Sequence, residues 1–163
     1  MVDPEHAREA LRPLLEQTFG RWEASAGTAY AAETWYATLV TALAQEAKSI
    51  PEMVALSAFA FEERVTRLTP AAQEALAGPW APQVLRHCLD TLTPDAVASS
   101  QAAAEYLRAL RHHWRDVAGL RGQQVMFPLR AALTGTMVGP CLGIVLSLLG
   151  WERCRQRLQD RLP

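Results

Sequence analysis

Helix-start signals recur along this chain, and they constrain its fold more than any other feature. Asp3, Thr69 and Thr93 are each followed by proline, and proline at the first helical position after a capping side chain is typical of a helix start. Ser49 with Glu52 three residues later has the spacing of a capping box. Leucine and alanine follow at helical spacing, whereas alternating strand patterns are nearly absent. The pattern predicts an all-α fold.

Size and composition indicate one globular unit. The chain has 163 residues, half of them hydrophobic, and a net charge of −1, which suits one domain or two small ones that share a core. The sequence has no apolar run long enough to span a bilayer, and its start lacks the layout of a signal peptide. We therefore expect a cytoplasmic protein.

Familiar catalytic and metal-binding patterns are missing from the sequence. It has no phosphate-binding GxxxxGK[ST] loop, no HExxH and no CxxC. Cys88, Cys141 and Cys154 are widely spaced and are expected to be small buried hydrophobes. His112 and His113 are adjacent on a predicted helix, so they point to different faces. We expect no catalytic residues, no metal and no cofactor.

Charge is divided unevenly along the chain. Residues 1–104 contain 13 acidic and 7 basic residues, whereas residues 105–163 contain 9 arginines and 4 acids. Arginine suits planar contacts with phosphates and base edges, so this division favours a polyanionic partner near the C-terminal third.

One apolar segment, FPLRAALTGTMVGPCLG at positions 127–143, contains a single charge, Arg130. Within residues 126–158, the run Pro-Leu-Arg-x-Ala-x-Thr-Gly, a Gly-Pro pair and a hydrophobic helix ending in Leu149-Gly150 resemble the C-terminal end of bacterial glutamyl-tRNA synthetases. A weaker match lies at Lys48 to Phe61. The resemblance covers roughly residues 8–162, and the two catalytic motifs of that family are absent from it.

The resemblance implies a stand-alone anticodon-binding domain, an all-α cage of two closely packed subdomains that cannot aminoacylate by itself. We expect subdomains at residues 1–95 and 96–163, with the PLRAALTG…GP motif in the second. The implied partner is the anticodon arm of tRNA-Glu or a similar tRNA. The matching RNA-binding positions are Arg130, Gly139, Pro140 and Leu142, with Met137 as apolar support and Arg108, Arg111, Arg115 and Arg121 as phosphate contacts.

Two departures from the family pattern keep other functions open. Glu46 stands where the family has an arginine, and Gln124 where it often has a lysine. The alternative functions are a protein-interaction or regulatory module that kept the fold and lost RNA binding, or a non-covalent subunit of a split synthetase. Five tryptophans, at positions 22, 35, 80, 114 and 151, are more than the core needs, so one or two are expected at a partner surface. Arg130 itself has a second interpretation, as a bridge between helix C-termini.

Overall fold

The computed structural model describes residues 2–20 and 24–163, and every regular element in those two segments is helical. The α-helices are α1 (Pro4–Phe19), α2 (Ala32–Glu46), α3 (Ile50–Leu56), α4 (Ala58–Phe61), α5 (Pro70–Leu76), α6 (Ala81–Thr91), α7 (Ser100–Ala118), α8 (Gly122–Thr134) and α9 (Leu142–Asp160). A short 3₁₀ helix, Asp95–Val97, precedes α7. The all-α prediction is confirmed.

The predicted helix starts are also confirmed, because each depends on local chemistry. The side chains of Asp3, Ser49 and Thr69 accept backbone N–H bonds at the starts of α1, α3 and α5. The segment after Thr93 contains the predicted break, since its 3₁₀ turn ends before Ser99 caps α7. α7 then ends at Gly119, in the left-handed conformation that favours glycine.

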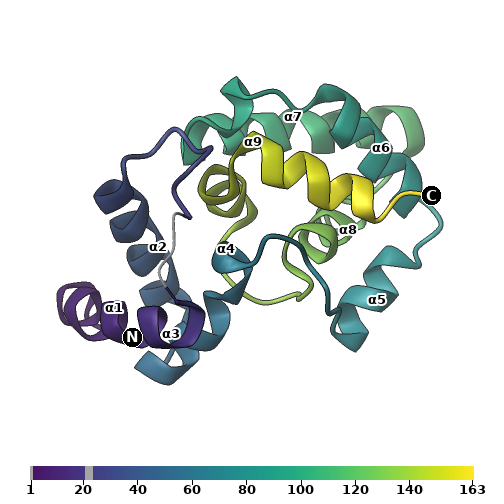
Figure 1. The fold of residues 1–163 in the computed structure, drawn as a ribbon. Helices are drawn as coiled ribbons and strands as arrows, with labels where there is room; N and C mark the ends of the chain where they lie inside the picture. Colours follow the sequence, from purple (N-terminus) through teal and green to yellow (C-terminus); the bar gives the residue numbers. More distant parts are fainter. Residues whose placement is uncertain (1, 21–23) are drawn as a thin grey trace.

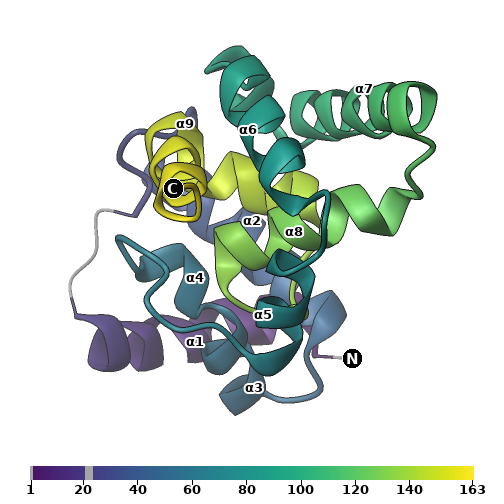
Figure 2. The same cartoon turned by 90° about the vertical axis from the view of Figure 1, so that its right-hand side faces the viewer.

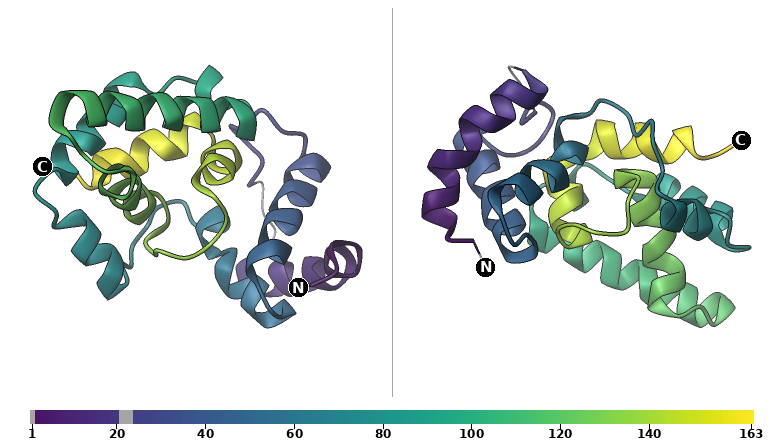
Figure 3. Two further views of the ribbon diagram at one scale, coloured as in Figure 1. Left: turned by 180° about the vertical axis from the view of Figure 1, so that it is seen from behind. Right: turned by 90° about the horizontal axis from the view of Figure 1, so that it is seen from below.

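Helix α9 joins the two sides of the molecule. Figure 1 shows α1–α3 on one side, α5–α8 on the other, and α9 between them. α9 packs against α2 and α4 as well as α6, α7 and α8. Figure 2 shows α8 surrounded by α5, α6 and α7, and Figure 3 shows α7 lying across the back. The proposed boundary at residues 95 and 96 stays a prediction, and α5 and α6 pack against α8 from across it.

The core is continuous between the two sides. Trp35 of α2 is fully buried, and its indole N–H donates to the Leu148 carbonyl of α9 at 2.8 Å. Gly150 bends α9 with φ 79°, and the Gly27 carbonyl approaches so closely that a Cβ at position 150 would lie 2.5 Å from its oxygen. Only glycine fits that backbone without strain. The predicted division of the C-terminal segment into two helical pieces at Gly150 is confirmed.

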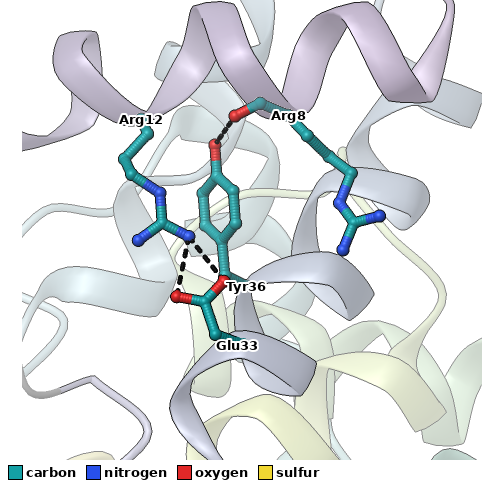
Figure 4. Close-up of polar contacts among 4 residues, drawn as sticks. All are labelled: Arg8, Arg12, Glu33 and Tyr36. Atoms are coloured by element: carbon teal, nitrogen blue, oxygen red, sulfur yellow. Dashed lines mark hydrogen bonds and ion pairs between the residues drawn. The ribbon is translucent and has the colours of Figure 1, made fainter.

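A cluster of polar contacts fixes α1 against α2 (Figure 4). The Tyr36 hydroxyl donates to the Arg8 carbonyl at 2.7 Å, and Arg12 bonds Glu33 at 2.9 Å. The Arg12 guanidinium also lies over the Tyr36 ring, 4.3 Å from its centroid. Burial raises the pKa of Tyr36, so its hydroxyl stays protonated as a donor. These contacts serve the fold of the N-terminal side.

Candidate nucleic-acid interface

The segment that follows α8 is a tight turn held by threonine hydroxyls. α8 includes Pro128 and ends at Thr134, after which Gly135 adopts φ 77°. The Gly135 carbonyl accepts the Thr69 N–H at 2.9 Å, which ties the turn to the start of α5. The Thr136 hydroxyl donates to the Val138 carbonyl at 2.9 Å. The chain therefore presents residues 136–141 as an ordered turn.

Arg130 lies on α8 beside this turn and is half-buried. Its Nη1 is buried and has no hydrogen-bond partner among the described residues. A Cβ at Gly139, which has φ 133°, would lie 3.9 Å from that nitrogen, so the turn backbone packs against the guanidinium. Burial lowers the pKa of Arg130, but an arginine keeps its charge at physiological pH. The site thus holds a half-buried cation whose Nη1 has no acceptor within the described residues.

An acid faces this cation from the other side of the molecule. Glu46, the last residue of α2, is exposed, and its charge acts on Arg130 together with the Cys141 side chain to oppose the pKa lowering. The carboxylate at the end of α2 therefore affects the cation on α8 through its negative charge.

The other motif positions lie around Arg130 at different depths. Pro140 is buried, and Leu142 is 3% exposed and belongs to the core at the start of α9. Gly139 and Met137 are half-buried. Leu142 and Pro140 consequently support the turn from beneath, and their contact with a base stays a prediction.

The expected phosphate contacts are all exposed but differ in their surroundings. Arg108, Arg111 and Arg115 share a face of α7, and Arg121 precedes α8. Arg115 lies 2.6 Å from His112 Nδ1 and 3.8 Å from Asp116, so its charge is partly balanced. Arg121 begins the helix that carries Arg130. The roles of these four arginines stay predictions.

Two arginines of α9 and the arginine that follows it have a role that the sequence did not predict. Arg157 is fully buried and donates to the carbonyls of Leu133, Phe59 and Glu62. Arg153 donates to the carbonyls of Ala60 and Ala24, both at 2.8 Å. Arg161 donates to the carbonyl of Val65. We call Arg153, Arg157 and Arg161 the arginine clamp.

The clamp reduces the basic surface that the charge division predicted. Its members are spaced four residues apart, which places them on one helix face, and this spacing was the available signal. Burial lowers the pKa of Arg157 to about 10. These arginines bridge chain segments, which is the alternative role considered above for Arg130.

Tryptophans and cysteines give a mixed outcome. Trp35 and Trp114 are buried and Trp80 is 38% exposed, so the expectation of an exposed tryptophan is confirmed, whereas Trp22 lies outside the described residues. Cys88 and Cys154 are buried as expected. The expectation for Cys141 was wrong. It is exposed because it is the N-cap of α9 and so precedes the buried first turn of that helix.

Across residues 2–20 and 24–163, no group of three or more His, Cys, Asp and Glu side chains could hold a metal ion. Within the same segments, no helix is both long enough and apolar enough to cross a membrane.

The family of the chain follows from its comparison with known protein families. The family described as "Anticodon binding domain" matches residues 6–162. The chain belongs to the anticodon-binding domain family. The fold supports this, since it superposes on a glutamate–tRNA ligase of Elizabethkingia meningosepticum with a TM-score of 0.75 at 15% identity, covering 98% of this chain and 29% of that one.

Relatives of this anticodon-binding domain are glutamate–tRNA ligases. It is 36% identical over 123 residues to glutamate–tRNA ligase 1 of Methylorubrum extorquens, covering 74% of this chain and 24% of the relative. The ligase of Staphylococcus saprophyticus is 30% identical over 125 residues, covering 77% and 25%. The chain spans about a quarter of the length of these relatives, and the match is confined to the anticodon-binding part.

Proposed function

We propose that this domain binds the anticodon arm of a tRNA, of the glutamate type or similar, in the cytoplasm. One observation carries the proposal: the buried, unpaired Nη1 of Arg130 beside the Gly139 turn. A buried donor without a partner is costly, so a structure retains it where a ligand supplies the acceptor. The family to which the chain belongs makes an anticodon base the natural ligand.

Arg130 defines what the site recognises. Its guanidinium donates to acceptors on a base edge. Exposed arginines at positions 108, 111, 115 and 121 supply the phosphate attraction that gives RNA affinity its salt dependence. The domain contributes recognition, and we assign no catalytic step to its residues.

The test is a fluorescence-anisotropy titration at low salt with a labelled anticodon stem-loop of tRNA-Glu. A hairpin with the same stem and an unrelated loop is the control RNA. We expect tighter binding to the anticodon loop and a weakening of about tenfold in Arg130→Gln, the value of one arginine contact with a base. Arg115→Gln is the matched control. It should weaken binding by a smaller factor, because the Arg115 guanidinium already contacts His112 and Asp116.

Equal binding of both hairpins at every salt concentration would refute anticodon recognition. A protein pull-down from cell extract with and without RNase would then distinguish the alternatives. Partners that survive RNase treatment would indicate a protein-interaction module.

A further inference from the structure

An apolar groove between α5 and α8 shares Met137 with the RNA-binding positions described so far but extends well beyond them. Its volume is about 480 Å³, and Trp80, Phe127 and Met137 line it. Trp80 is 38% exposed and Phe127 is 48% exposed, which is unusual for such large apolar side chains. Gln123 and Gln124 add amide groups to the wall, and Glu74 is the one charged residue of the lining.

The ring of Trp80 is positioned by a neighbouring tryptophan. It packs edge-on against Trp114, with centroids 6.1 Å apart and an angle of 62° between the planes. Trp114 is 8% exposed and is flanked by His87 and His113 at 5.6 and 5.5 Å. A fixed aromatic ring loses little conformational entropy when a ligand stacks on it. The groove is therefore a prepared aromatic surface.

The groove and the Arg130 site are neighbours along α8 and the turn that follows it. Phe127 and Arg130 are three residues apart on α8, so they lie on one face of the helix, one turn from each other. Met137, from the groove, and Gly139, beside Arg130, belong to the same turn. Arg121 begins α8 at the other end, about 13 Å along the axis from Arg130 by the rise of the helix. An apolar surface thus lies between two cations.

This arrangement matches the chemistry of single-stranded nucleic acid. Binding sites of that kind combine aromatic side chains on which bases stack with arginines that follow the backbone. The groove lining carries no cation, so phosphates would remain outside at Arg121 and Arg130 while a neutral ring enters. The amides of Gln123 and Gln124 can bond a base edge.

We propose that the α5–α8 groove is a stacking site for an unpaired nucleobase next to the one at Arg130. The inference rests on the proposed RNA binding and deepens it, because it assigns a second base position. The ligand is a nucleotide of the same RNA strand.

The test uses the stem-loop titration with groove variants and modified loops. Phe127→Ala should weaken binding by about 5- to 150-fold, the range expected for loss of one stacked base. Val117→Ala is the matched control, since Val117 is 61% exposed on α7 and does not line the groove. Phe127→Trp should restore affinity, because stacking needs an aromatic face and not phenylalanine as such.

Loops with one abasic nucleotide locate the stacked base. Removing that base should weaken binding to the unaltered protein by a similar factor and leave binding to Phe127→Ala unchanged. Binding that is sensitive to Arg130→Gln but not to Phe127→Ala would overturn the groove site and leave the proposed function intact. Absence of loop-specific binding by the unaltered protein would overturn both.

A second copy of the chain could also occupy the groove. Sedimentation velocity over a range of protein concentrations measures such self-association directly. Self-association that disappears in Phe127→Ala, together with unchanged RNA affinity, would make the groove a dimer surface and overturn the proposal.

Discussion

Arg157 and Arg130 are both arginines in the interior of helices, yet their surroundings differ completely. Arg157 on α9 is fully buried, and its Nη1 and Nη2 donate to carbonyls of Leu133, Phe59 and Glu62. Arg130 on α8 is half-buried, and its Nη1 has no partner among the described residues. Arg157 satisfies backbone carbonyls of its own chain, whereas Nη1 of Arg130 has no acceptor among the described residues.

The comparison teaches how to separate structural from functional arginines on one surface. Nine arginines in the last 59 residues look equivalent in the sequence. Those of the clamp supply donors to carbonyls at helix ends, where intrahelical partners run out. Donation by the Nη atoms to carbonyls distinguishes the clamp from Arg130, whereas Nε of Arg157 and Arg161 is also buried without a partner in the described residues.

The largest expected effect is the loss of stability in Arg157→Met. Three carbonyls would lose their donor in the interior, and we expect the free energy of unfolding to fall by about 3 kcal/mol or more. Urea denaturation followed by circular dichroism measures it. Arg130→Met is the matched control and should change stability by less than about 1 kcal/mol, because no carbonyl depends on it. Similar losses in both variants would remove the distinction between the two arginines.

The bend that orients the clamp gives the next effect. Gly150→Ala forces a Cβ to within 2.5 Å of the Gly27 oxygen at φ 79°, and we expect a loss of about 2–3 kcal/mol. Gly119→Ala is the control, since its φ is 66° but nothing lies within 4 Å of the added Cβ. It should cost about 1 kcal/mol. Thermal unfolding of both variants would show whether crowding at Gly150 adds to the conformational penalty.

A smaller effect is expected from the acid that faces Arg130. Glu46→Gln removes a carboxylate beside the RNA site, and affinity for the stem-loop at low salt should rise about fivefold, the equivalent of about 1 kcal/mol. Glu62→Gln is the control because Glu62 lies beside Arg157. Weaker binding in Glu46→Gln would instead show that the carboxylate accepts a hydrogen bond from a base.

The smallest effect concerns pH. Burial and the charge of His113 lower the pKa of His87, whose ring stacks on that of His113 with centroids 4.3 Å apart. The unfolded chain therefore binds more protons near pH 6.5, so stability present above that pH is lost as pH falls through 6.5 toward the lower folded pKa. His87→Asn should flatten the dependence between pH 7 and 5 in urea titrations. The slope should be shallow, because Asp90 opposes the shift.

Local chemistry was predictable from the sequence, and tertiary chemistry was not. Asp3, Ser49 and Thr69 cap their helices because a cap needs only the next three residues. The motif around Arg130 located a candidate site because its pattern is contiguous. The partners of Arg157 lie up to 98 residues away, so no local pattern could identify them. Cys141 was misplaced because neighbouring hydrophobicity does not say which way a residue at a helix boundary points.

The arginine clamp also sets an order of events during synthesis. Residues 59–65 emerge from the ribosome long before α9. Their carbonyls have no hydrogen-bond donors until positions 153, 157 and 161 have been synthesised. Contacts of such long sequence separation close late in folding. The early helices therefore lack these hydrogen bonds until the last helix has been synthesised.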